Sequence, residues 1–66
     1  MNLRKLRAKF VEQDVNVEVI AEIIGIDRST MYRKLNNFEK ITIGEAKKLK
    51  EALSLTDEEA NEIFLN

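Results

Sequence analysis

Apolar residues recur at intervals of three and four along five short stretches of the chain, the spacing of helices that each bury one face. Near the middle, Ile20 and Ile24 lie four residues apart, and Met31 and Leu35 repeat that spacing further on. Gly25 separates the two pairs. Because glycine adopts a left-handed backbone without a side-chain clash, we expect the first helix to end there and the chain to reverse sharply. The pattern predicts two short helices joined by a tight turn.

Polar residues suited to helix caps precede the apolar stretches. Asn16 and Asp27 are good N-caps, and Thr42 with Glu45 three residues later has the pattern of a capping box. The first three predicted helices run from about Leu3 to Gln13, Val17 to Ile24 and Arg28 to Asn36. The fourth opens at the Thr42 capping box and runs to Leu53, and Thr56 or Asp57 caps the last. With no proline and no repeat or linker, we expect an all-α fold in a single domain, residues 1–66.

The predicted helix at about 28–36 has an exposed face with groups that can contact base edges in DNA. Arginine can donate two hydrogen bonds to guanine, serine can contact a base or a phosphate, and tyrosine can pack on a thymine methyl or approach a phosphate. The candidate base-contacting residues are Arg28, Ser29, Tyr32 and Arg33. The alternative is a solvated helix face, where such residues are ordinary. We favour the DNA interpretation because a helix-turn-helix pattern surrounds these residues.

This pattern resembles the Cro and phage-repressor (XRE-like) family of helix-turn-helix DNA-binding proteins. The resemblance covers nearly the whole chain and is carried by Ile20-Ala21, Ile24-Gly25-Ile26, the run from Asp27 to Leu35, Thr42 to Ala46, and Leu53 to Leu55. It implies a lambda repressor-like compact bundle of about five short helices, whose second motif helix enters the major groove of a double-stranded operator. It also implies a phage or prophage transcription regulator. Lys34 departs from the family, which commonly has an apolar residue there, and we expect Leu35 to replace it on the inner face.

The resemblance also places contacts to the DNA backbone at the start of the second motif helix and in the loop after it. The candidate phosphate-contacting residues are Thr30, Lys34, Asn36, Asn37, Lys40 and Thr42. Other roles remain open for several of them. Thr42 is favoured as a helix cap, Asn36 and Asn37 can form a C-cap and turn, and Lys40 can be a solvated charge. Lys34 is expected to point to phosphate or to solvent.

The composition excludes most catalytic chemistry. The chain has neither cysteine nor histidine, so disulfides, cysteine-bound zinc and the commonest general base are all missing. Ser29 therefore has no histidine to activate it. The acidic residues from Asp57 to Glu62 are better explained as charge at a helix start than as a metal site. We expect no catalytic residue, no metal or cofactor, and no small-molecule substrate, so the protein is predicted not to be an enzyme.

The charge distribution leaves a second function open. Residues 1–40 hold eight basic and six acidic groups (+2), and residues 41–66 hold three basic and six acidic ones (−3), which gives the net charge of −1. A basic face on a neutral molecule can still bind phosphates, although long-range attraction to DNA is weak. The alternative is a protein-interaction module, an antirepressor or adaptor, on the same helix-turn-helix scaffold.

The C-terminal residues and the hydropathy suggest an assembly state and a location. Ile63, Phe64 and Leu65 are either the last core contacts or a dimer patch, with Leu65 and Ile23 left over from the predicted core. We expect a weak homodimer, formed mainly on the operator. No apolar run approaches the ~20 residues of a membrane span, and the first ten residues lack the apolar segment of a signal peptide. A cytoplasmic protein without a membrane partner is the expectation.

Overall fold

The computed structural model describes residues 1–65, which form five helices and no strand. The helices are α1 (Leu3–Glu12), α2 (Val17–Ile24), α3 (Arg28–Leu35), α4 (Ile43–Ala52) and α5 (Asp57–Phe64). The predicted all-α fold is therefore confirmed. Three predicted helix ends, at Gln13, Asn36 and Leu53, lie one residue too far along, because these residues are the C-caps.

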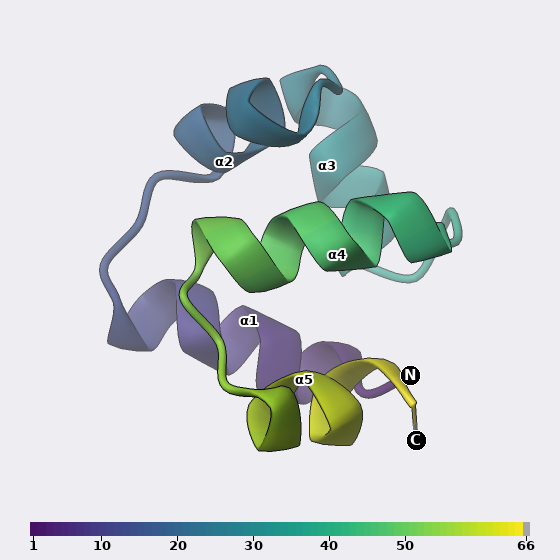
Figure 1. The fold of residues 1–66 in the computed structure, drawn as a ribbon. Helices are drawn as coiled ribbons and strands as arrows, with labels where there is room; N and C mark the ends of the chain where they lie inside the picture. Colours follow the sequence, from purple (N-terminus) through teal and green to yellow (C-terminus); the bar gives the residue numbers. More distant parts are fainter. Residues whose placement is uncertain (66) are drawn as a thin grey trace.

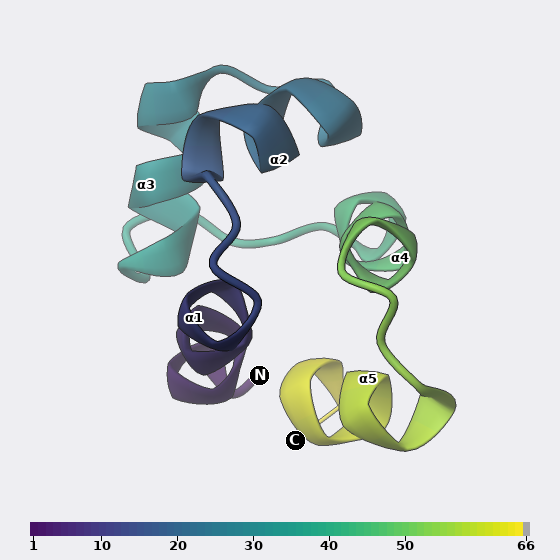
Figure 2. The same ribbon diagram turned by 90° about the vertical axis from the view of Figure 1, so that its left-hand side faces the viewer.

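The helices stack in three levels (Figure 1). α2 and α3 lie together at the top, α4 and α1 cross the middle on opposite sides, and α5 closes the base. Turned by 90°, the molecule shows α3 above α1 along one edge, and α4 above α5 along the other (Figure 2). The two chain ends lie side by side, where the Asn2 amide donates to the Ile63 carbonyl at 2.6 Å.

Each helix begins at a polar side chain that accepts a hydrogen bond from an amide of its first turn. These N-caps are Asn2, Asn16, Asp27, Thr42 and Thr56. Thr42 and Thr56 form complete capping boxes with Glu45 and Glu59. Such caps satisfy amides that have no partner within the helix. The last helix is thus capped by Thr56 and not by Asp57.

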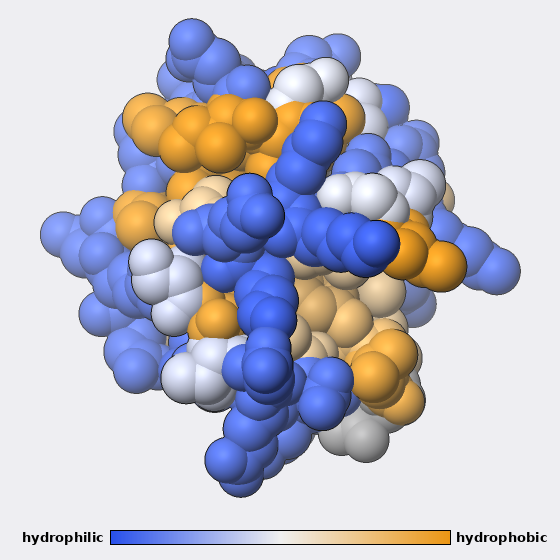
Figure 3. Space-filling model, in the orientation of Figure 1, coloured by the Kyte–Doolittle hydropathy of each residue, from blue (hydrophilic) through white to orange (hydrophobic). Residues whose placement is uncertain are grey.

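One hydrophobic core joins all five helices. Its largest fully buried side chains are Leu6, Met31, Leu49, Leu53 and Ile63. At the C-terminal end, Phe64 is half-buried, whereas Leu65 is 77% exposed. The structure thus assigns Ile63 to the core and leaves Leu65 outside it. Ile23 is also exposed on α2, where apolar side chains gather at the surface (Figure 3).

Side chains of α1 and its C-cap satisfy carbonyl groups at the ends of two other helices. The Arg7 Nη1 donates to the Leu35 carbonyl at 2.6 Å, and the Gln13 Nε2 donates to the Leu53 carbonyl at 2.7 Å. Carbonyl groups in the last turn of a helix lack intrahelical partners, and a cation there also interacts favourably with the helix dipole. α1 therefore holds the C-terminal ends of α3 and α4 in place.

The two glycines allow a direct test of backbone conformation. Gly25 caps α2 with a φ of 85°, whereas Gly44 lies within α4, and a Cβ added at either position would meet no close neighbour. We expect Gly25→Ala to lower the free energy of unfolding by about 1–2 kcal/mol, because the left-handed region is unfavourable for alanine. Gly44→Ala is the matched control and should raise it by about 0.5–1 kcal/mol. Urea unfolding followed by circular dichroism measures both, and equal effects would contradict the role of φ.

An ion pair between α1 and α5 should make stability depend on acid pH. Hydrogen bonds from the Lys9 ammonium and, to a smaller extent, from the Thr56 amide lower the pKa of Glu59 from 4.5 to about 2. A lowered pKa in the folded state adds stability above the unfolded pKa, and this stability is lost as the pH falls through the folded value. Thermal stability should therefore fall between about pH 4.5 and about pH 2. Glu59→Gln, which can still complete the capping box, should flatten this dependence, whereas Glu58→Gln is the control for the loss of one carboxylate.

Candidate nucleic-acid interface

Hydrogen bonds on both sides hold the turn between α2 and α3. The backbone amides of Gly25 and Ile26 both donate to the Ala21 carbonyl, at 2.9 and 3.0 Å. On the other side, the Asp27 carboxylate accepts from the Thr30 amide at 2.7 Å. The left-handed conformation predicted for Gly25 is confirmed, and Ile26 packs against the core. These hydrogen bonds fix the end of α2 and the start of α3 on either side of the turn.

α3 has one buried and one exposed side. Met31 and Leu35 face inward and are 0% and 4% exposed, as the spacing predicted. The helix runs along one edge of the molecule, whereas α4 and α5 occupy the other edge (Figure 2). The candidate base-contacting residues Arg28, Ser29, Tyr32 and Arg33 are all exposed. They lie together on the solvent side of a helix whose opposite side is anchored in the core.

Carboxylates from neighbouring segments hold both arginines. The Arg28 Nη1 forms an ion pair with the Glu18 carboxylate of α2, which raises the pKa of Arg28 above its usual value. The Arg33 Nε lies 3.6 Å from the Glu39 Oε1 in the following loop, and its Nη2 donates to the Thr30 hydroxyl at 3.1 Å. Both arginine side chains remain more than half exposed, at 64% and 51%. They are oriented, yet open to a ligand.

The other two candidate base-contacting residues, Ser29 and Tyr32, are both exposed, and the hydroxyl of Ser29 already has a hydrogen-bond partner. The Ser29 hydroxyl donates to the Asp27 carboxylate at 3.0 Å. Hydrogen bonds from Thr30 and Ser29 lower the pKa of Asp27, so the helix cap stays charged at neutral pH. Tyr32 is 46% exposed. Ser29 would therefore have to exchange an internal hydrogen bond for a DNA contact.

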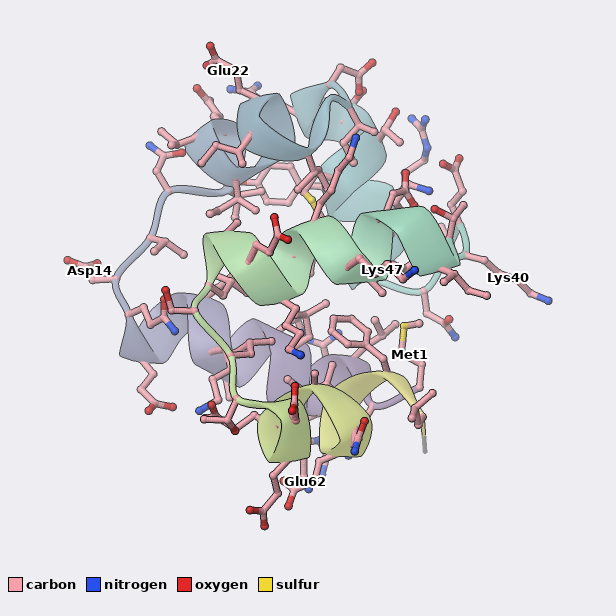
Figure 4. All side chains as sticks on the ribbon, in the orientation of Figure 1. Met1, Asp14, Glu22, Lys40, Lys47 and Glu62 are labelled. Carbon is pink, nitrogen blue, oxygen red and sulfur yellow. The ribbon has the colours of Figure 1, made fainter. Side chains whose placement is uncertain are left out.

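Most of the candidate phosphate-contacting residues follow α3. Asn36, Asn37, Lys40 and Thr42 are exposed in the connection from α3 to α4, and Thr30 is half-buried within α3. Asn36 is the C-cap and donates from its Nδ2 to the Tyr32 carbonyl at 2.9 Å, while Asn37 makes the turn with a φ of 64°. The side chain of Lys40 projects away from the molecule (Figure 4). The capping and turn roles are confirmed, and the phosphate contacts stay predictions.

Lys34 corrects one expectation. It does not point to phosphate or to solvent, because it is only 5% exposed. Its Nζ donates to the Lys40 carbonyl at 2.8 Å and forms ion pairs with Glu45 at 3.0 Å and Glu39 at 3.3 Å. The position three residues after Met31 lies on the inner side of the helix, and these oxygen atoms let an ammonium group occupy it. The three-residue spacing between Met31 and Lys34 could have predicted this burial. The groups that pair with the ammonium could not be predicted in the same way, because they belong to the loop and to α4.

Lys34 remains charged despite its burial. Burial lowers the pKa of Lys34, but hydrogen bonds to Glu45 and Glu39 outweigh it and raise the pKa above its usual value. Burial raises the pKa of Glu45, because it disfavours the charged carboxylate. Hydrogen bonds from the Thr42 amide and the Lys34 ammonium outweigh this effect, so the pKa of Glu45 is lowered. Both partners therefore stay ionised at neutral pH.

Sequence reasoning missed Glu18 and Glu39, the carboxylates that hold the two arginines. Glu18 lies on α2 and meets Arg28 only because the turn brings the start of α3 close to it. No spacing within one helix signals such a pair. Glu39 meets Arg33 from the loop after α3, and the sequence predicts no conformation for that loop that would bring the two together.

Removal of the Glu18 carboxylate tests the predicted contact of Arg28 with DNA. We expect Glu18→Gln to tighten binding to a mixed-sequence duplex about fivefold, because two unit charges about 4 Å apart in water repel each other by about 1 kcal/mol, and a phosphate bound to Arg28 would lie near the Glu18 carboxylate. Discrimination between sequences should fall, because the guanidinium loses its partner. Fluorescence anisotropy measures both. Glu51→Gln, on α4, is the control for the same change of charge, and an equal effect there would contradict the role of Glu18.

A second surface lies away from α3. A groove of about 310 Å³ runs between α4 and α5. Met1, Ile43 and Leu65 line it and are 48%, 80% and 77% exposed. Lys47, on the outer side of α4, is also part of its lining (Figure 4). The groove is therefore apolar with a basic margin.

Comparisons with known proteins do not extend this description. No protein-family model, curated protein or solved structure matches the chain. Within residues 1–65, no three histidine, cysteine or acidic side chains are placed to hold a metal ion. No helix in that part of the chain combines the length and the apolar character needed to cross a membrane.

Proposed function

We propose that this protein is a sequence-specific transcription regulator of Cro or repressor type that reads the major groove of double-stranded DNA with α3. The observation that carries the proposal is the exposed side of α3, where Arg28, Ser29, Tyr32 and Arg33 lie together while Met31 anchors the opposite side. A helix about 10–12 Å wide fits a major groove about 12 Å wide. α2, the turn and α3 would then act as a DNA-binding helix-turn-helix.

The proposed contacts divide into two kinds. The arginines would donate to base edges and choose the sequence, whereas Lys40 and the residues around it would bind phosphates and set the register. Arg28, Arg33 and Lys40 are exposed basic side chains of α3 and the loop that follows it, which supports the division. Glu18 and Glu39 offset part of this charge, whereas the acidic first turn of α5 lies at the base of the molecule, away from α3 (Figure 1). The regulator would act by occupying its operator and excluding polymerase, which requires a cytoplasmic location beside the chromosome.

The groove between α4 and α5 supports a weak homodimer. A second copy seated there would cover Met1, Ile43 and Leu65, which are exposed in the single chain. Burial of exposed apolar side chains favours association. A two-fold dimer would present two α3 helices to half-sites about 34 Å apart on one face of the DNA. We propose that this dimer forms mainly on the operator.

Selection of bound duplexes from a random DNA pool at two salt concentrations tests the proposal. The expected result is a palindromic consensus with half-sites about one helical turn apart. No enrichment, with weak binding lost by about 200 mM salt, would leave only non-specific phosphate contacts. That outcome would overturn the proposal and favour a protein-interaction module, an antirepressor or adaptor.

A further inference from the structure

We propose that Lys34 is a positioning residue, whose buried ammonium orders the connection between α3 and α4 and so presents Lys40 to the DNA backbone. The connection comprises residues 36–42. The presentation of Lys40 to phosphate rests on the proposed function. The ordering of the loop by Lys34 does not, and it can be tested without DNA.

The loop closes around one ammonium group. The Lys34 Nζ comes from the last turn of α3 and meets oxygen atoms from the loop and from the first turn of α4. These are the Lys40 carbonyl at 2.8 Å, the Glu45 Oε1 at 3.0 Å and the Glu39 Oε2 at 3.3 Å. An ammonium has three donors, so this set can occupy all of them. One side chain of α3 therefore holds both the loop and the start of α4.

Glu45 extends this link to the cap of α4. Its Oε1 accepts from the Thr42 amide at 2.9 Å and also meets the Lys34 Nζ. The capping box that starts α4 is thereby joined to the end of α3. The position at which α4 begins depends on Lys34 as well as on its own cap.

Apolar packing contributes less to this loop than to the helices. Among residues 36–41, Ile41 is buried, whereas Phe38 is 81% exposed. The Phe38 amide donates to the Arg33 carbonyl at 2.8 Å, which holds the first half of the loop. The second half is held by Ile41 in the core and by the contacts of Lys34. Removal of the ammonium should therefore loosen residues 39 and 40 most, because Ile41 stays anchored in the core.

The orientation of Lys40 follows from this contact. Its carbonyl points inward to the Lys34 Nζ, whereas its side chain projects away from the molecule (Figure 4). A carbonyl that is fixed on the inside limits the directions open to the side chain. Lys34 would thus act on DNA binding through Lys40 without touching DNA itself.

The test uses the double variant Lys34→Met with Glu45→Gln, because this pair removes the ammonium without changing the net charge. Glutamine keeps the capping box with Thr42. Backbone ¹⁵N relaxation is measured first without DNA. For residues 39 and 40, which contact the ammonium, we expect order parameters of about 0.85 in the parent and below about 0.6 in the variant. A mobile loop in the parent, or an ordered one in the variant, would overturn the proposal.

The second measurement asks whether Lys34 acts through Lys40. Lys40→Ala is introduced into the parent and into the variant, and binding to a mixed-sequence duplex of about two helical turns is followed against salt. In the parent the slope of log K against log salt should become shallower by about 0.9, the value for one phosphate contact. In the variant Lys40→Ala should change it little. Equal changes in both backgrounds would show a purely structural role for Lys34 and overturn the proposal.

The outcomes separate this inference from the proposed function. If the parent binds no duplex, the proposed function fails together with the phosphate contact of Lys40, while the order parameters still decide whether Lys34 orders the loop. If the double variant does not fold, Lys34→Gln replaces it, because its neutral amide has two donors on a shorter side chain and cannot reproduce the three contacts of the ammonium. A loop in Lys34→Gln as ordered as in the parent would then overturn the proposal.

Discussion

Met31→Ala is expected to lower the free energy of unfolding by about 2–5 kcal/mol, the usual cost of truncating a buried methionine. Met31 is 0% exposed and lies on the inner side of α3, so its removal leaves a cavity where this helix meets the core. A domain of this size has only about 3–10 kcal/mol of stability in total. The variant should therefore lose a large part of its stability, and at the lower end of that range much of it would be unfolded at room temperature. Urea unfolding followed by circular dichroism measures the loss.

Two controls separate the cavity from other effects. Met31→Leu nearly conserves volume and should cost less than about 1.5 kcal/mol. Tyr32→Ala alters the next residue, which is 46% exposed, and should change stability by less than about 1 kcal/mol. A stability loss for Tyr32→Ala as large as that for Met31→Ala would contradict the orientation of α3.

Arg28→Ala and Arg33→Ala are each expected to weaken operator binding by about 1–3 kcal/mol and to relax the preference at one or two base pairs. The reason is that an arginine on the exposed side of α3 can donate two hydrogen bonds to a guanine, which no other base accepts in the same way. Lys40→Ala should instead weaken all sequences alike. Binding of each variant to the selected duplex and to its single-base substitutions measures the difference.

The matched control for these arginines is Lys47→Ala, which removes one positive charge from α4. Lys47 lies on the outer side of α4, away from α3 (Figure 4). It should leave the base preference unchanged. Any change in affinity would come from the small change in net charge and from the margin of the groove in which the second copy is proposed to sit. If neither arginine variant changed the preference more than Lys47→Ala does, α3 would not be the reading helix.

Local patterns in the sequence predicted most of the fold. The periodic apolar residues located all five helices, and the caps Asn16, Asp27 and Thr42 marked helix starts to the residue. Gly25 marked the end of α2. Such signals work because a cap, a capping box or a left-handed turn involves residues only two to four positions apart. The same periodicity placed Met31 on the buried side of α3.

Contacts between distant segments could not be predicted in this way. The pairing of Arg28 with Glu18 and the donation from Arg7 to the Leu35 carbonyl both join residues from different helices. Neither has a fixed separation along the chain that a sequence pattern could signal. For the candidate site, the sequence located the exposed residues of α3, but the contacts that hold them were missed.

Lys34 marks the limit of what the sequence determines and the point at which the tertiary structure is needed. The sequence by itself determined the helices, their caps and which side of α3 faces the core, because these depend on interactions within a few residues. Whether a lysine at the inner position of that helix turns outward or stays buried depends on the free energy of desolvating its ammonium. Only the tertiary structure decided this, because it brings Glu39, Glu45 and the Lys40 carbonyl around the Nζ and offsets the cost of burial.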